Sequence, residues 1–388
     1  MIPLALTRLV LTDFRNYTYL KLETDTRPVV LTGPNGSGKT NLLEAISFFS
    51  PGRGLRRARL KEVGNTDAKK GWAVSALLKD EEFEHRLGTG LITKIVDGDI
   101  QERRTVRIDG ENNLKATDFG SLISVGWLTP QMDRLFHEGA GGRRRFLDRL
   151  AFGYDPEHAK RTALYEKTMR ERNRLLKEGR LDPHWLSSLE HRLAELGFAI
   201  HAVREETTAR LNQAMLEEEQ KATNASVKAF PKAEITIAGE FEDNVSGLTA
   251  LAAEDHFRDE LAKRRQIDGR AGSTTYGPHR ADMAVFHREK DQEAALCSTG
   301  EQKALLISII LADARLQAGL HGKAPVLLLD EITAHLDQKR RQALFDEIIA
   351  LDMQAWMTGT DQLLFSELGE RAQFFTVDSG RISPAELC

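Results

Sequence analysis

Two short runs are apolar at almost every position and are followed at once by glycine or polar residues. Residues 28–32 (PVVLT) precede a glycine-rich segment, and residues 325–329 (PVLLL) precede Asp330 and Glu331. Strands without polar alternation are typical of parallel sheets that are buried on both faces. Because ligands bind at the carboxyl ends of such strands, the pattern predicts an α/β domain with its functional residues at that edge.

A different pattern, with polar positions and turn residues between short apolar runs, predicts antiparallel strands. Residues 4–11 and 19–22 form one such pair. Four more strands are expected before residue 109, at 72–78, 83–87, 93–96 and 105–108. Asp-Gly pairs at two of the breaks are a hairpin signal, and Gly88 with Gly90 marks another break. Further strands are expected at 122–128, 283–286 and 354–358.

From about residue 155 to residue 216, charges become dense and helix-forming residues dominate. Alternating spacings of three and four define a heptad seam of Leu186, Leu189, Leu193, Leu196, Ile200, Val203 and Thr207. A helical stretch at 159–177 precedes it, with a turn at Gly179, so the two helices are expected to pair antiparallel within the chain. Residues 248–265 predict a third helix. We therefore expect an α/β domain in two pieces, 1–150 and 273–388, separated by a helical arm at 151–272.

Composition narrows the class of protein. The 388 residues suggest two or three structural units. A net charge of −4 indicates that any nucleic-acid binding comes from local basic patches. Cys297 and Cys388 lie far apart and the histidines have no zinc-site spacing, so zinc is not expected. The longest apolar segment, 304–312, is shorter than a membrane helix, and no signal peptide is recognisable, which predicts a cytoplasmic protein without a membrane partner.

The segment after the first apolar strand matches the phosphate-loop pattern G-x-x-x-x-G-K-[ST]. It lies between a predicted strand and a predicted helix, the context in which this pattern binds phosphate. Glycines allow backbone N–H groups to surround phosphate oxygens, and the helix start adds further donors. The candidate nucleotide-binding residues are Gly33, Pro34, Asn35, Gly36, Ser37, Gly38, Lys39, Thr40 and Asn41.

Two carboxylates complete this candidate site. Asp330 follows the second apolar strand and can hold Mg²⁺ opposite Lys39 and Thr40, whose hydroxyl is a further metal ligand. Glu331 can act as the general base that polarises the attacking water. The sequence therefore predicts ATP and Mg²⁺ as ligands.

Clusters of cations occur at residues 53–61, 143–145 and 263–270. A solvated loop and a surface that contacts ATP phosphates or a nucleic-acid backbone both fit the first cluster. The candidate DNA-binding residues are Arg56, Arg57, Arg59, Arg143, Arg144, Arg264 and Arg265.

The order of the motifs resembles that of ABC-type ATPases. A phosphate loop, a glutamine after a strand, Ser-x-Gly-Glu-Gln at 298–302, an apolar strand with Asp-Glu, and Leu-Asp at 336–337 follow one another. With a helical insert, the chain is similar to the SMC-like branch and most of all to the RecF family of bacterial DNA replication and repair proteins. Residues 11–17, 33–45, 141–148, 276–282, 298–303 and 326–337 carry this resemblance.

The resemblance implies an ABC-type (SMC-like) ATPase head with mixed parallel and antiparallel sheets and an inserted helical arm. It assigns Lys39 to catalysis with Glu331, and Gln131 to metal and water sensing. The signature at 298–303, with Ser298, Gly300, Glu301 and Gln302, and the dimer-contact Asp337 would complete the ATP site of a second copy. Arg15 and Asn16 would lie near the nucleotide.

The resemblance also implies a function. One phosphate loop and one signature per chain require an ATP-dependent, head-to-tail homodimer with C2 symmetry. In this family such a dimer is expected to act as a clamp on double-stranded DNA at single-strand gaps, with weak DNA-stimulated hydrolysis. Partners similar to RecO and RecR would help it load a RecA-type recombinase in repair, replication restart and the SOS response. Residues 358–360 carry no switch histidine, and the turn at 277–280 is either architectural or touches DNA.

Two other functions share parts of this motif order. A transporter ATPase subunit is disfavoured by the helical insert and by the missing switch histidine. An SMC-type chromosome organiser needs arms of hundreds of residues, whereas a helix of ~25 residues reaches only ~40 Å at 1.5 Å per residue.

Overall fold

The computed structural model describes residues 3–65, 71–80, 82–96, 99–179, 182–221, 229–334 and 336–385, with only the backbone at 93–101 and 218–221. The chain forms two compact units. Unit 1 comprises Met1–Asp133, Glu217–Pro231 and Ser298–Cys388, and unit 2 comprises Arg134–Leu216 and Lys232–Cys297. Unit 2 thus begins at residue 134 and ends at residue 297, with residues 217–231 assigned to unit 1, whereas the expected arm spans 151–272. Helix α2 (Ala140–Ala151) belongs to unit 2 because it packs on β9 (Asp282–His287).

A six-stranded sheet in unit 1 contains both fully apolar runs. Its order is β14-β13-β3-β12-β11-β7. The strands are β3 (Val29–Thr32), β7 (Val125–Leu128), β11 (Val326–Leu329), β12 (Ala355–Gly359), β13 (Gln373–Asp378) and β14 (Arg381–Pro384). All neighbours pair in parallel except β13 with β14. The parallel arrangement predicted from β3 and β11 is confirmed by these pairings, and every residue of the two strands is buried.

Strands β13 and β14 were not anticipated from the sequence. Strand β13 mixes buried and half-buried positions, and β14 is mostly exposed. The partner that orders β13 is β3, with Phe375 opposite Leu31 in a parallel register. The sequence pattern of β13 alone therefore gave little indication of a strand, because its pairing partner lies more than 340 residues away in the chain.

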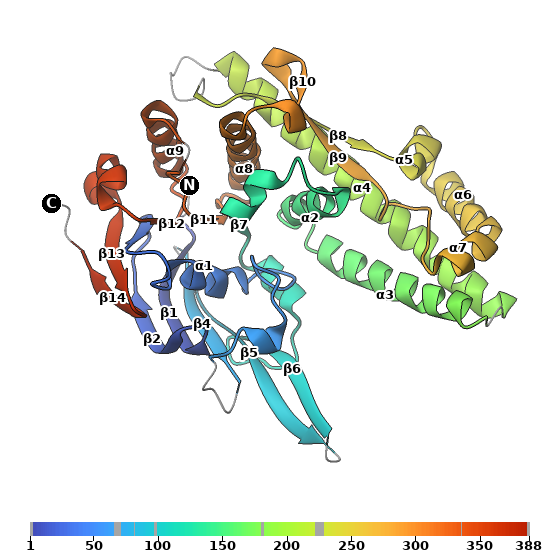
Figure 1. The fold of residues 1–388 in the computed structure, drawn as a ribbon, viewed down its shortest axis with the longest axis horizontal. Coiled ribbons are helices and arrows are strands. Elements are labelled where there is room, and N and C mark those ends of the chain that lie inside the picture. Colours follow the sequence, from blue (N-terminus) through green and yellow to red (C-terminus); the bar gives the residue numbers. More distant parts are fainter. Residues whose placement is uncertain are drawn as a thin grey trace. The chain divides into compact units, whose positions relative to one another are not determined.

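A five-stranded antiparallel sheet forms the other layer of unit 1, in the order β2-β1-β4-β5-β6. Its strands are β1 (Ala5–Phe14), β2 (Tyr17–Glu23), β4 (Ala73–Lys79), β5 (Glu84–Val96) and β6 (Asp99–Ile108). The expected break at Gly88 and Gly90 is wrong, because β5 runs straight through both residues. Glycine is needed at position 90 of this strand, because an added Cβ would lie 2.5 Å from the Trp72 carbonyl oxygen. Figure 1 shows β5 and β6 extending beyond the shorter strands beside them.

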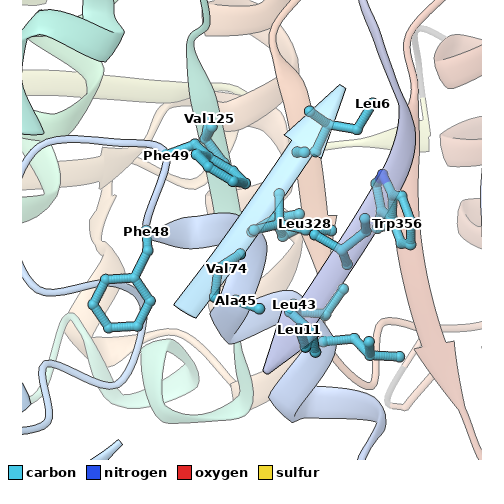
Figure 2. Packing of buried hydrophobic residues seen from close by; sticks show 14 of the residues in the cluster. Leu6, Leu11, Leu43, Ala45, Phe48, Phe49, Val74, Val125, Leu328 and Trp356 are labelled. Carbon is cyan, nitrogen blue, oxygen red and sulfur yellow. The ribbon is translucent and has the colours of Figure 1, made fainter. Parts of the chain in front are cut away.

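The core of unit 1 lies where the two sheets meet helix α1 (Lys39–Ser47). Leucines of β1, α1 and β11 belong to one buried cluster with Phe48, Phe49 and Trp356. Figure 2 shows these side chains gathered around α1. The rings of Phe14, Phe48 and Trp72 pack at centroid distances of 5.0–6.0 Å, which closes the cluster beside the antiparallel sheet.

A buried amide joins the two sheets. Gln354 accepts hydrogen bonds at Oε1 from the Leu6 N–H (2.9 Å) and the Trp356 indole (3.1 Å). Its Nε2 donates to the carbonyl oxygens of Leu6 (3.1 Å) and Asp25 (2.8 Å). Every polar group of this side chain is therefore satisfied, which is what allows it to be 1% exposed in an apolar core.

Helices α8 (Thr299–His321) and α9 (Gln338–Ala350) also belong to unit 1. By length and composition α8 could cross a membrane, which the shorter apolar run at 304–312 did not suggest. However, 67% of its most apolar stretch is buried inside the protein. A helix that is apolar on all sides is expected at such a core position.

Unit 2 is built on an antiparallel helix pair. Helix α3 (His158–Lys177) confirms the expected stretch, and α4 (Pro183–Lys221) contains the heptad seam. Leu175 and Leu176 near the end of α3 cluster with Leu186 and Leu189 near the start of α4. The seam is therefore used for internal packing. Helices α5 (Glu240–Val245), α6 (Ala250–Lys263) and α7 (Arg265–Ala271), with a sheet of β10 (Gln292–Glu293), β9 and β8 (Ala233–Ala238), complete the unit.

The turn at residues 277–280 is anchored in unit 2, with Gly277 and Pro278 buried, His279 half-buried and Arg280 exposed. His279 Nδ1 lies 2.8 Å from the Tyr165 hydroxyl, and Nε2 lies 2.9 Å from the Thr274 carbonyl oxygen. The carbonyl partner requires a proton on Nε2, so Nδ1 accepts from Tyr165. Burial lowers the pKa of His279 to about 4, which keeps the ring neutral. An added Cβ at Gly277 would lie 2.6 Å from the Phe257 ring, so the start of this turn packs closely against a helix of unit 2. This packing favours an architectural role for the turn over a contact with DNA.

A buried carboxyl in unit 2 predicts a pH-dependent stability. Both Glu242 oxygens are buried without a hydrogen-bond partner in the described chain, and burial raises its pKa to about 7. The folded state therefore binds this proton more tightly than the unfolded chain, so the free energy of unfolding falls as pH rises from about 4.5 to about 7. Glu242→Gln is expected to stabilise unit 2 above pH 7 by up to about 3 kcal/mol. Urea denaturation at pH 5 and pH 8 measures this, with the exposed Asp243→Asn as control; equal pH slopes for all three proteins would contradict it.

Candidate nucleotide-binding site

The phosphate loop joins β3 to α1 and depends on glycine at defined positions. Gly33, Gly36 and Gly38 have φ angles of 144°, 81° and 117°, a region that favours glycine. An added Cβ at Gly33 would lie 2.1 Å from the Val377 carbonyl oxygen, and one at Gly38 would lie 2.6 Å from the Tyr17 hydroxyl. The loop therefore needs glycine both for its backbone conformation and for its close contacts.

Lys39 lies across the loop. Its Nζ donates to the carbonyl oxygens of Gly33 (2.8 Å) and Pro34 (2.9 Å). Burial lowers the pKa of Lys39, and the negative charges of Glu331 and Asp330 oppose that shift. Ser37 Oγ is buried and has no hydrogen-bond partner among the described residues. A buried hydroxyl without a partner, beside an ammonium group and a helix start, fits a phosphate ligand.

A hydroxyl–carboxylate cluster lies at the carboxyl end of β11. Thr40 Oγ1 and Thr358 Oγ1 each donate to Asp330 Oδ1 at 2.8 Å. The structure thus brings Thr40 and Asp330 together across 290 residues, as predicted. In the described chain no group of three or more His, Cys, Asp or Glu residues could hold a metal by itself. One carboxylate and one hydroxyl suit Mg²⁺, which commonly completes its shell with water and substrate phosphates.

Gln131 follows β7, the strand that pairs with β11 at this edge of the sheet. Leu128 at the end of β7 is paired with Leu329, and the Asp330 N–H donates to the Leu128 carbonyl (2.9 Å). Gln131 follows on a short 3₁₀ helix, Pro130–Arg134, and its side chain is exposed.

Glu331 has an unusual backbone for a residue other than glycine, with φ of 49°. Its N–H donates to Thr358 Oγ1 at 2.8 Å, and its side chain is exposed at the strand edge. Lys303 of α8 donates to the carbonyl oxygens of Ala334 (2.7 Å) and Glu331 (3.5 Å). Burial lowers the pKa of Lys303, whereas the charges of Asp133, Glu331 and Asp330 oppose that shift. The sequence placed Lys303 in the signature and Thr358 at the position of the switch histidine, but it predicted no contact of either residue with Glu331.

The residues before the loop brace it from one side. Asn16 Nδ2 donates to the Ser37 carbonyl (3.2 Å), and Asn41 Nδ2 donates to Asn16 Oδ1 (2.7 Å). Arg15 forms two hydrogen bonds with Glu44, at 2.6 and 2.8 Å, and Glu44 is fully buried. Sequence reasoning placed Arg15 near the nucleotide but missed Glu44; the signal available was a single acid inside the apolar helix LLEAI.

The signature and the dimer-contact residue both begin helices. The backbone N–H and the hydroxyl of Ser298 donate to Glu301 Oε2, at 3.0 and 2.8 Å, at the start of α8. Asp337 Oδ1 accepts from the Arg340 N–H (2.8 Å) at the start of α9. Ser298 and Asp337 are exposed, Gly300 and Glu301 are half-buried, and Gln302 is buried.

The candidate DNA-binding arginines fall into two groups. In unit 2, Arg143 pairs with Asp282 (2.7 Å), Arg144 donates to the Ala281 carbonyl, and Arg265 pairs with Glu190 (2.5 Å). Arg264 pairs with Glu240 (2.5 Å) and lies over the Tyr276 ring. These four residues therefore hold unit 2 together.

The other group lies on the loop between α1 and β4 in unit 1. Arg57 and Arg59 are exposed, and Arg59 Nε lies 3.9 Å from the Glu62 carboxylate. Arg56 instead donates to Glu44 (3.0 Å) and to Asn41 (2.7 Å), which ties this loop to the phosphate-loop helix.

Comparison with known proteins agrees with this architecture. A family model described as the RecF/RecN/SMC N terminal domain matches residues 5–383. The DNA replication and repair protein RecF of Allorhizobium ampelinum is 50% identical over 376 residues, 97% of this chain and 98% of the relative.

Solved structures show the same fold. A structure of the recombination mediator protein RecF-ATPrS in the RecFOR pathway has a TM-score of 0.81 at 23% identity, covering 99% of each chain. An Smc head domain derived from Pyrococcus furiosus has a TM-score of 0.53 at 15% identity, covering 99% of this chain and 96% of that one. The fold is therefore that of an SMC-like, ABC-type ATPase head with an inserted helical unit. On the family model and on the identity to curated relatives, the chain belongs to the RecF family.

Proposed function

We propose that this protein is an ATP-dependent DNA-binding protein of recombinational repair, whose ATP-bound homodimer acts as a clamp at gaps and single-strand/double-strand junctions. The observation that carries the nucleotide part is the Thr40–Asp330–Thr358 cluster beside a phosphate loop whose Ser37 hydroxyl is buried and has no hydrogen-bond partner among the described residues. The name of the relative, a DNA replication and repair protein, supports the DNA part.

The residues divide the chemistry of ATP hydrolysis among them. Lys39 and the loop N–H groups bind the phosphates, and Thr40, Asp330 and Gln131 hold Mg²⁺. When bound, Mg²⁺ neutralises the charge that develops on the phosphate oxygens. Glu331 accepts the proton of the attacking water as general base. We expect a weak, DNA-stimulated ATPase.

The signature supports a dimer. Ser298 is exposed at the start of α8, a helix terminus that favours anions. Each chain has one phosphate loop and one signature, so two copies related by C2 symmetry complete two sites. Asp337, exposed at the start of α9, would contact the second copy.

Local cations support DNA binding on unit 1 in spite of the net charge of −4. Besides Arg57 and Arg59, a surface cavity of about 360 Å³ is lined by Arg103, Arg104 and Arg107, and no carboxylate appears among its lining residues in the described chain. Among the residues that the structure describes, the Arg104 guanidinium donates to the Thr89 hydroxyl and to the carbonyl oxygens of Gly52 and Phe48. Burial lowers the pKa of Arg104 to about 10, which leaves it charged at neutral pH. Such cations suit a phosphodiester backbone.

The partners follow from the relatives. One solved relative is described as a recombination mediator in the RecFOR pathway. We therefore propose RecO- and RecR-like partners, a role in recombinase loading during repair, replication and the SOS response, and a cytoplasmic location. In this proposal unit 1 is the ATPase head and unit 2 is the arm.

The test is retention on gapped duplex DNA with and without ATP. Wild type is expected to be retained only with ATP, and Lys39→Arg is expected to lose this difference. The hydrolysis rate per subunit is expected to rise with protein concentration, because each site needs a second copy. ATP-independent retention, or a rate per subunit that stays flat across a wide dilution series, would overturn the clamp.

A further inference from the structure

The candidate general base has a strained backbone that two neighbouring side chains hold from both ends. The φ angle of Glu331 is 49°, a value that residues with a Cβ atom rarely adopt. Such conformations persist only where the surrounding structure determines them, and they gather at functional sites. The contacts of the Glu331 peptide groups therefore need an explanation beyond sheet formation.

The first contact is with the hydroxyl of Thr358 at the end of β12. This hydroxyl accepts from the Glu331 N–H and donates to Asp330 Oδ1, both at 2.8 Å. It uses one donor and one acceptor function at once, and Thr358 is 0% exposed. A single buried hydroxyl thus fixes the proposed metal ligand and the proposed base relative to each other.

The second contact is with the ammonium group of Lys303 on α8. Lys303 donates to the carbonyl oxygens of Ala334 and Glu331, the two ends of a tight turn. The same turn is closed by the Ala334 N–H, which donates to the Glu331 carbonyl at 3.1 Å. Lys303 is 2% exposed, so its charge is directed at this turn and not at solvent.

We propose that Thr358 and Lys303 are positioning residues for ATP hydrolysis, which hold the Glu331 backbone so that its carboxylate faces the attacking water. This inference rests on the proposed ATPase function. It assigns Thr358, at the place where transporter ATPases carry a switch histidine, a role in orienting the base through its backbone. It also links the signature helix α8 to the catalytic turn of the same chain, because Lys303 lies five residues after Ser298.

The experiment compares Thr358→Val and Lys303→Met with two controls. Thr358→Ser keeps the hydroxyl, and Thr376→Val makes the same chemical change on β13, another strand of the same sheet. We expect kcat to fall about 10²-fold in the first two variants, the loss typical of a displaced catalytic group, with nucleotide affinity within a few-fold of wild type. Both controls are expected to stay near wild type.

A measurement made without nucleotide tests whether the two side chains hold the Glu331 turn, independently of the hydrolysis rate. Amide hydrogen exchange of residues 331–334 is expected to become faster in Thr358→Val and Lys303→Met but not in the controls, because each variant removes a hydrogen bond of this turn. In a Glu331→Gln background, Lys303→Met is expected to cause no further loss of kcat, since Lys303 donates to the turn of Glu331 and the group that it positions is already gone.

The outcomes are distinguishable from failure of the proposed function. Absence of Lys39-dependent hydrolysis in wild type would overturn the ATPase proposal, whereas unchanged exchange in Thr358→Val and Lys303→Met would overturn the positioning role by itself. Wild-type kcat in both variants, or an additional loss on top of Glu331→Gln, would also overturn it.

Discussion

Replacing Glu331 with glutamine is expected to lower the ATP hydrolysis rate by about 10²–10⁴-fold, the usual contribution of a general base. Glutamine keeps the shape of the side chain and most of its hydrogen bonding, but it cannot accept the proton of the attacking water. Because Lys39, Thr40 and Asp330 are unchanged, nucleotide affinity is expected to stay near wild type. The loss should therefore appear in kcat and not in binding.

The same variant is expected to remain on DNA longer than wild type in the presence of ATP. If hydrolysis opens the dimer, a protein that binds ATP without hydrolysing it stays in the clamped state. Steady-state hydrolysis and ATP-dependent retention on gapped DNA measure the two effects, with the exposed Glu370→Gln of the same unit as control. A Glu331→Gln protein that hydrolyses ATP at the wild-type rate would exclude Glu331 as the base; one that leaves DNA as fast as wild type would exclude the clamp.

The second large effect is expected from Arg172, at the centre of unit 2. This guanidinium is completely buried and donates to Glu190 (3.1 Å), Asp268 (2.7 Å) and the Leu261 carbonyl (2.7 Å). Removing one partner from a buried ion network leaves an uncompensated charge, which typically costs about 3–5 kcal/mol. Arg172→Met is therefore expected to lower the free energy of unfolding of unit 2 by about that amount.

Arg170 provides a matched control on the same helix. Its contact with Glu166 is 3.6 Å long and both side chains are about two-thirds exposed, so Arg170→Met is expected to cost less than about 1 kcal/mol. Urea denaturation followed by a probe in unit 2 measures both variants. Equal denaturation midpoints would show that the buried network contributes nothing beyond an exposed ion pair.

The parts of the fold that could be predicted from the sequence are those whose signal is local. Uniform apolarity identified β3 and β11 as parallel strands, and the pattern of 33–40 identified the phosphate loop. The order of the motifs identified the family. In each case the residues that carry the information lie within one element or directly after it.

The parts that could not be predicted depend on partners distant in sequence. Strand β13 is ordered by β3, and β5 continues through Gly90 because the backbone of Trp72 lies against it. The basic clusters show the same limit. The sequence of a basic cluster is the same whether its side chains face solvent or pair with carboxylates. The ion pairs of Arg143 and Arg265 could therefore be identified only from the structure.

The roles of Lys303 and Thr358 at the site could not be predicted for a related reason. Both side chains contact the backbone of Glu331, and contacts with backbone atoms follow no sequence pattern. The positive φ angle of Glu331 could not be predicted from the sequence either, because glutamate rarely adopts positive φ angles.

The strand order of the parallel sheet has a consequence for how the chain is made. Strand β3 ends at residue 32, but its two neighbours, β12 and β13, begin at residues 355 and 373. At a synthesis rate of 5–20 residues per second, β12 leaves the ribosome roughly 15–65 s after β3. Throughout that interval the phosphate loop follows a strand whose two neighbours have not been made, and the helices of unit 2 emerge before either neighbour. The nucleotide site is therefore among the last features of this protein to form, and a truncated translation product cannot assemble it.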